Sequence, residues 1–208
     1  MTLILIFLTS LISVIALNNR KWFDLLKFNP ALIRDAREGW RFFSYGLIHA
    51  DYIHLIVNMF VLYSFGPLVE AFYEIHFHPK AEFYFILLYA GGIVLSVVSS
   101  YARHKGDVFY NAVGASGAVS GVVFALILFH PGLPLRFIFV PVEIPAVIFG
   151  GVYLGYSWYM SRRGDGLIGH DAHFWGGVFG FVYTLALKPS LMIDFAGHIL
   201  RILPFGKG

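Results

Sequence analysis

The stretch GASGAVSGVVFALILF, residues 114–129, decides the fold, because it is almost entirely apolar yet carries serine and glycine at regular intervals. Gly117, Gly121 and Ala125 recur every four residues, which places them on one face of a helix. Small residues at this spacing let a second helix approach closely, a pattern typical of packed membrane helices. The stretch therefore predicts a membrane-embedded helix with Ser116 close to its start.

The composition of the whole chain agrees with a membrane protein. Its 208 residues are 58% hydrophobic and only 13% charged, far more apolar than the usual soluble domain. The formal net charge of +3 comes from scattered lysines and arginines, so we expect the lipid bilayer and not nucleic acid as a partner. The chain has no cysteine, which excludes disulfides, thiolate catalysis and cysteine-based metal sites.

Hydropathy along the chain indicates six candidate spans, compared with the roughly 20 apolar residues that cross about 30 Å of hydrocarbon. They are residues 2–17, 54–73, 83–101, 115–129, 137–160 and 172–187. Three of them are short and would thin the bilayer locally or end below its surface, leaving a polar end in a water-filled pocket. We expect an all-α polytopic membrane protein, a single domain over residues 1–208 with six transmembrane helices.

Two segments of this plan allow other interpretations. The first span could be a signal peptide, but it lacks a basic region before it, and Ile15-Ala16-Leu17-Asn18 is a poor cleavage sequence. The connection over residues 18–51 mixes charged residues with tryptophan and phenylalanine. Such a mixture is typical of an element that lies in the membrane interface.

Two side chains capable of acid–base chemistry stand in apolar segments, where polar groups are costly and therefore usually functional. One is Ser116, and the other is His173, one turn before Gly176 on the last expected span. Gly176 and Gly180 form a small-residue face that matches that of the fourth span. A serine in a membrane helix is often only structural, but packing these two faces would bring its hydroxyl near the imidazole, as nucleophilic catalysis requires.

The second span begins with His54 and Asn58, four residues apart and so on one helix face. They form either a structural polar pair between helices or a donor pair for a developing oxyanion, where one donor typically contributes about 3–4 kcal/mol. Gly114 and the start of the helix at Ser116 offer free backbone N–H groups to the same oxygen.

Together these motifs resemble those of the rhomboid family of intramembrane serine proteases. They occur in the family's order and cover almost the whole chain: Trp40-Arg41, His54-x-x-x-Asn58, Gly114-x-Ser116-Gly117 and His173-x-x-Gly176. The resemblance implies that Ser116 is the nucleophile, that His173 is the base, and that His54, Asn58 and the Ser116 N–H group form the oxyanion hole. It also implies a half-embedded hairpin over residues 18–51, single-span or multi-span membrane proteins as substrates, and no cofactor.

One position departs from the family pattern. Many relatives carry Tyr or Phe four residues after the nucleophile, where the ring supports the catalytic histidine, whereas this chain has Ser120. Either another aromatic residue such as Trp175 or Tyr153 supports the ring, or the dyad is held more loosely. The alternative function is therefore a weakly active or inactive rhomboid-like protein that binds transmembrane segments.

The charges give a conflicting orientation. The family's site opens toward the extracytoplasmic face of the cell membrane, on the side of the loops after the first, third and fifth spans. Those loops hold ten basic residues (Arg20, Lys21, Lys27, Arg34, Arg37, Arg41, Arg103, Lys105, Arg162, Arg163) against five on the other side (Lys80, Arg136, Lys188, Arg201, Lys207). Alone, the positive-inside rule would place the active face in the cytoplasm. Six of the ten lie in the hairpin. Without them, four basic residues on the active side face five on the other side, which favours neither orientation, so we follow the family orientation.

Other readings are less favoured. His170-Asp171-x-His173 could indicate a metal site, but a third ligand and an HExxH pattern are missing. We place His170 and Asp171 at the water-exposed end of the last span, with Asp171 as a helix cap. His49, just before the second span, could bond within the hairpin. A small transporter is a distant alternative, because no span carries a deep acidic residue and no inverted repeat is present.

Overall fold

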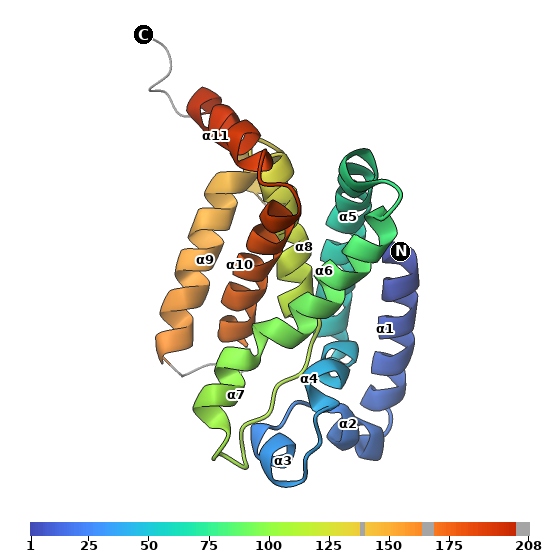
Figure 1. The fold of residues 1–208 in the computed structure, drawn as a ribbon. Coiled ribbons are helices and arrows are strands. Elements are labelled where there is room, and N and C mark those ends of the chain that lie inside the picture. The colour runs from blue at the N-terminus through green and yellow to red at the C-terminus, as the bar shows by residue number, and fades with distance from the viewer. Residues whose placement is uncertain (138–139, 164–168, 203–208) are drawn as a thin grey trace.

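Helices account for most of the chain in the computed structural model, which describes residues 1–137, 140–163 and 169–202 (Figure 1). They are α1 (Thr2–Leu17), α2 (Arg20–Leu26), α3 (Pro30–Asp35), α4 (Arg41–Ser44), the 3-10 helix η1 (Tyr45–Leu47), α5 (Tyr52–Phe77), α6 (Ala81–Ser96), α7 (Val98–His104), α8 (Ser116–Phe129), α9 (Ala146–Arg163), α10 (His170–Leu187) and α11 (Leu191–Ile202). The long helices run side by side as a bundle, and the short helices α2, α3 and α4 lie at one end of it.

Only some of these helices have the length and apolarity of a membrane span by themselves. Among the described residues, α5 and the stretch Ala81–His104 qualify, and α10 with α11, bent by 120°, would be a third if the pair is one span. The apolar helices α1 and α8 have 16 and 14 residues. Helix length and composition therefore support two or three spans and not the full six.

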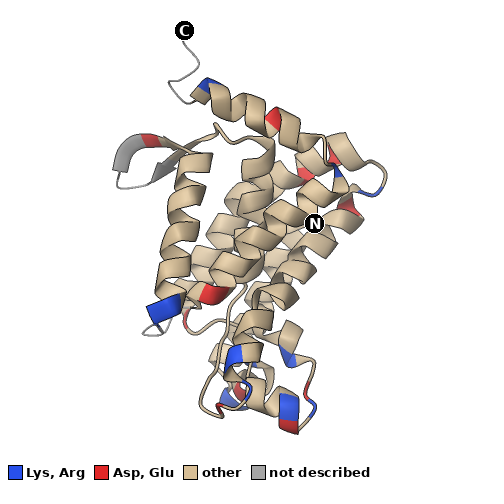
Figure 2. Cartoon of the chain, turned by 60° about the vertical axis from the view of Figure 1, so that its left-hand side comes forward, with Lys and Arg blue, Asp and Glu red and all other residues tan. Residues whose placement is uncertain are grey.

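Charged residues are arranged as in a membrane protein. Figure 2 shows lysine, arginine, aspartate and glutamate toward the two ends of the bundle, with a middle band almost free of them. Large apolar side chains such as Phe7, Ile53 and Val152 are exposed on the outside of the bundle. A band of this kind suits a lipid environment.

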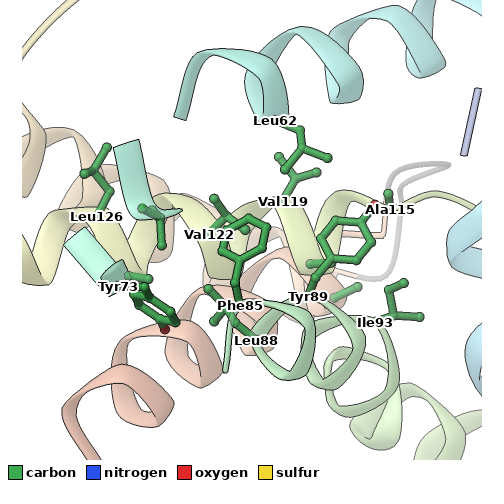
Figure 3. Packing of buried hydrophobic residues seen from close by; sticks show 14 of the residues in the cluster. Leu62, Tyr73, Phe85, Leu88, Tyr89, Ile93, Ala115, Val119, Val122 and Leu126 are labelled. Atoms are coloured by element: carbon green, nitrogen blue, oxygen red, sulfur yellow. The ribbon is translucent and has the colours of Figure 1, made fainter. Parts of the chain in front are cut away.

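Helix α8 is the centre of the bundle, since all of its residues after Ser116 are buried. Leu62 of α5 and the α6 residues Phe85, Tyr89 and Ile93 pack around it (Figure 3). Two contacts bring α6 especially close to its neighbours: a Cβ at Gly92 would lie 2.8 Å from the Cα of Ala118 on α8, and one at Gly91 would lie 2.6 Å from the Phe179 ring on α10. The helices α6, α8 and α10 therefore form one tightly packed layer.

Residues 134–145 are a correction to the all-helical expectation. Strands β1 (Pro134–Phe137) and β2 (Val140–Pro145) pair antiparallel, with Pro134 opposite Pro145. The fifth span was expected from residue 137, but helix α9 begins at Ala146, and residues 138–139 lie outside the described residues, as does Lys207. Pro141 and Pro145 lack the N–H group that a helix interior needs, and the alternating Val140, Val142 and Ile144 favour an extended backbone.

The connection over residues 18–51 is held together by Arg41, which is only 3% exposed. Its guanidinium donates to the backbone carbonyls of Asp24 at 3.0 Å and Lys27 at 2.7 Å and pairs with Glu38. The hydroxyl of Ser44 donates to the carbonyl of Leu26 at 2.8 Å. These bonds tie α2 to α4, so Arg41 holds the hairpin together.

Candidate active site

A strained turn leads the chain into α8 and sets the position of Ser116, the first residue of that helix. Gly114 has a φ of +122°, in the region that favours glycine. Its N–H group donates to the carbonyl of Tyr45 at 3.0 Å, and a Cβ there would lie 2.7 Å from the Cε1 atom of His54. Both the backbone and the neighbouring imidazole therefore require glycine before the nucleophile candidate.

His49 fixes the next residue of this turn and is fully buried. Its Nε2 atom accepts the N–H group of Ala115 at 3.3 Å, and its Nδ1 atom lies 2.9 Å from the hydroxyl of Ser13 on α1. Because that hydroxyl donates to the carbonyl of Leu47 at 2.9 Å, the network assigns the proton of His49 to Nδ1. Burial lowers the pKa of His49 to about 3, which agrees with a neutral ring that accepts at Nε2.

His49 is predictable from the sequence only as a possible hairpin residue, and Ser13 is not predictable from it at all. A histidine a few residues before an apolar helix was the available signal for the first. Ser13 lies 36 positions away from His49 in the chain, so no local pattern could have pointed to it.

The glycine contact between α8 and α10, formed by Gly117, Gly121, Gly176 and Gly180, brings the two candidate catalytic residues into one region. A Cβ at Gly176 would lie 2.1 Å from the carbonyl oxygen of Gly117, and one at Gly180 would lie 2.0 Å from that of Gly121. The two backbones therefore touch directly. Ser116 precedes Gly117 on α8, and a Cβ at Gly117 would lie 3.3 Å from the carbonyl oxygen of Ala172, the residue before His173.

Ser116 and His173 are both partly exposed, at the end of the bundle where α8 and α10 begin (Figure 1). Within the described ranges, no side-chain hydrogen bond involves either residue. The 14 residues of α8 span about 21 Å, which is less than the roughly 30 Å of hydrocarbon. A nucleophile at the start of so short a helix can lie below the membrane surface and still be reached by water.

His54 and Asn58 stand on the first two turns of α5. The carboxylate of Asp51 caps this helix by accepting the N–H group of His54 at 2.7 Å, and the His54 ring meets the His49 ring edge-on at 5.0 Å. The Asn58 amide donates one N–H to the carbonyl of His54 at 2.9 Å and has a second N–H to offer. The structure thus brings His54 to the Gly114 turn and places Asn58 one turn further along α5.

The start of α8 adds backbone donors to this region. No side chain among the described residues caps the helix, so the N–H groups of its first turn, from Ser116 onward, have no side-chain acceptor there. Helix N-termini also carry a partial positive charge. Together with the imidazole of His54, they form an environment that can stabilise a developing negative charge on oxygen.

The other predicted residues lie apart from this centre. Trp40 is half-exposed at the start of α4, where its carbonyl accepts the N–H groups of Phe43 and Ser44. His170 is a correction to the expected water-exposed end, because its ring is buried between Tyr156 and His173. Asp171 lies in the first turn of α10, where it pairs with Arg103 and accepts the Ser100 hydroxyl at 2.8 Å, which joins α10 to α7.

Comparison with known proteins identifies relatives. The Rhomboid domain family model matches residues 36–190. The Putative rhomboid protease YdcA of Bacillus subtilis (strain 168) is 35% identical over 92 residues, 44% of this chain and 41% of that protein. The Rhomboid protease GlpG of Haemophilus influenzae is 27% identical over 127 residues, 58% of this chain and 61% of that protein. The chain thus spans about two fifths and three fifths of the lengths of these two relatives.

Proposed function

The chain belongs to the rhomboid family, and on this basis we propose that it is an intramembrane serine endopeptidase that hydrolyses peptide bonds in or near the transmembrane segments of other membrane proteins. The observation that carries the proposal is the glycine contact, which sets Ser116 and His173 on touching helices at one end of the bundle. The names of both relatives include rhomboid protease, which supports the same reaction class.

In the proposed reaction, His173 takes the hydroxyl proton of Ser116 as Oγ attacks the scissile carbonyl carbon. The carbonyl oxygen becomes an oxyanion that accepts hydrogen bonds from His54, Asn58 and the N–H group of Ser116. The C–N bond then breaks, and His173 gives its proton to the leaving amine. Water, with His173 again as base, adds to the acyl-enzyme ester and releases Ser116.

A transmembrane helix hides its carbonyl groups in internal hydrogen bonds, so we expect a substrate to unwind locally before attack. Glycine and other poor helix formers near the cleavage site would make this unwinding easier. The preferred substrates are therefore single-span or multi-span membrane proteins with such residues near one membrane surface.

Six spans and an extracytoplasmic active site in the cell membrane also belong to the proposal. The helices α1, α5, α6 with α7, α8, α9 and α10 would each cross the membrane, the shorter ones where the bilayer is thinned. The orientation follows the family and not the count of basic residues.

The first test is cleavage of a generic transmembrane substrate by the purified protein in detergent. Ser116→Ala and His173→Ala should abolish cleavage. Two matched controls, Ser64→Ala on the exposed side of α5 and His198→Ala on α11, should cleave as the wild type does. A wild type that binds the substrate without cutting it would favour the alternative, a rhomboid-like protein that only binds transmembrane segments.

Orientation can be tested with single cysteines because the chain has none of its own. Lys105→Cys lies at the end that holds Ser116, and Lys80→Cys lies in the turn between α5 and α6. In intact cells, a membrane-impermeant maleimide should label the first variant and spare the second. The reverse pattern would place the active site in the cytoplasm.

A further inference from the structure

The position that departs from the family pattern, Ser120, has a specific partner on another helix. Its hydroxyl lies 2.7 Å from the hydroxyl of Tyr153 on α9. The ring of Tyr153 stacks on the imidazole of His173, with centroids 6.0 Å apart and planes inclined by 18°. Three helices thus meet here, since α8 holds the tyrosine hydroxyl, α9 provides the ring and α10 carries the histidine.

The tyrosine ring is itself held in place by neighbours other than Ser120. It contacts Phe124 of α8 at 6.1 Å and Phe149 of its own helix at 5.8 Å between centroids. Near the same place, α9 approaches α8 closely, because a Cβ at Gly150 would lie 2.8 Å from Ile127 and 3.3 Å from Phe124. The Tyr153 ring is thereby fixed at both ends, by packing at its base and by a hydrogen bond at its tip.

The His173 imidazole has no comparable restraint from a polar partner within the described residues. Its ring contacts are the stacked Tyr153 and, edge-on at 5.9 Å, His170. Trp175, the other aromatic candidate, contacts Phe174 and is 42% exposed. The flat face of the imidazole is therefore covered by Tyr153.

We propose that Tyr153, anchored by Ser120, is the positioning residue that orients the His173 ring toward Ser116. This inference rests on the proposed function, because it assigns to His173 the role of base. A general base acts only within hydrogen-bond reach of its proton, and a misplacement of about 1 Å can lower a rate about 100-fold. An aromatic residue on α9 would in this way supply the ring that the family resemblance leads one to expect at the position of Ser120.

The test compares Tyr153→Ala, which removes the ring, with Tyr153→Phe, which removes only its hydroxyl. Tyr159→Ala, a change of an exposed tyrosine on the same helix, is the matched control. Two rates are measured: cleavage, separated into kcat and KM, and covalent labelling of Ser116 by a small fluorophosphonate. The small probe reports on the dyad without requiring a transmembrane substrate to enter.

We expect Tyr153→Ala to lower kcat and the labelling rate about 10- to 100-fold with little change in KM. Tyr153→Phe keeps the packed ring but loses the hydrogen bond to Ser120, so its loss should be smaller, a few-fold, while Tyr159→Ala should match the wild type. Because Ser120 and Tyr153 touch, the double substitution Ser120→Phe with Tyr153→Ala should restore much of the labelling by returning a ring to the same space. This rescue separates positioning from a general loss of folding.

Labelling of Tyr153→Ala at the wild-type rate would overturn the inference, and so would equal losses in Tyr153→Phe and Tyr153→Ala. A double variant that folds, as judged by its thermal midpoint, but labels no faster than Tyr153→Ala would also overturn it. In each of these cases the wild type still cleaves and the proposed function stands. A wild type that neither cleaves nor labels, while an active relative does both, would overturn the proposed function and this inference together.

Discussion

Replacing Gly180 by alanine should separate α8 from α10 and slow the proposed cleavage without altering the side chain of Ser116 or His173. A Cβ at position 180 would lie 2.0 Å from the carbonyl oxygen and 2.4 Å from the Cα of Gly121, whereas ordinary contact begins at 3.4 Å. Because both neighbours are backbone atoms, no side chain can rotate away. The helices must move apart by about 1.4 Å, the difference between 3.4 and 2.0 Å.

The size of the effect follows from this displacement. Overpacking of this kind costs about 1–3 kcal/mol, while alanine gains about 1 kcal/mol over glycine in helix propensity. The net loss of folding free energy is therefore at most about 2 kcal/mol. Since a shift of about 1 Å between reacting groups can lower a rate about 100-fold, activity should suffer far more than stability.

The assay measures the initial rate of substrate cleavage in detergent and the thermal unfolding midpoint of the same preparation. Gly155→Ala on α9 is the matched control, because a Cβ there would meet nothing within 4 Å. We expect that control to cleave normally and to unfold at the same temperature or higher. If Gly180→Ala cleaved at the wild-type rate with an unchanged midpoint, the glycine contact could not be what holds Ser116 and His173 together.

Three further predictions concern the supports of the site. His49→Phe removes the acceptor of the Ala115 N–H group, so the free energy of unfolding should fall by about 1–3 kcal/mol. Heat denaturation measures this fall beside the exposed control His78→Phe. Equal free energies of unfolding in the two variants would contradict a stabilising contact between His49 and Ala115. Acid should destabilise the protein through the same residue, because burial lowers the pKa of His49 from 6.5 to about 3 and the unfolded chain takes up a proton that the folded chain does not. The stability that the neutral His49 contributes is fully present above pH 6.5 and is lost as the pH falls toward 3, by up to about 1.4 kcal/mol per pH unit. His49→Phe should therefore flatten the plot of unfolding free energy against pH. Arg41→Lys keeps the charge but loses the planar guanidinium that reaches two backbone carbonyls. The thermal midpoint should therefore drop by the equivalent of about 1.5–3 kcal/mol, while the exposed control Arg34→Lys leaves it unchanged. A drop of the same size in both variants would refute a special role for Arg41.

The long helices and the contact between α8 and α10 are properties that the sequence could predict, because they follow from local patterns. Apolar runs mark the helices, and glycines spaced by four mark the faces that touch. The strand pair over residues 134–145 was not predicted because hydropathy alone cannot distinguish an apolar strand from an apolar helix. The prolines at 141 and 145 were the signal that could have corrected this.

The supports of the candidate site could be predicted only in part. The sequence indicates Tyr153 only as one of two aromatic candidates, and its choice over Trp175 depends on how α9 packs against α8. The contact of His49 with Ser13 depends on α1 lying against the hairpin, a long-range arrangement that no spacing within the sequence encodes. Positions defined by contacts between distant segments are thus the ones that required the structure.

The close packing of α6, α8 and α10 also restricts the path by which a polypeptide could arrive at Ser116. Where these helices touch through Gly92, Gly121 and Gly180, only movement of whole helices could open a passage. This side of the molecule is therefore closed to a polypeptide. On the opposite flank, the close approach of α9 to α8 at Gly150 is to the side chains of Ile127 and Phe124, and side chains can rotate. Under the proposed function, an incoming substrate segment should therefore approach Ser116 from the side of α9.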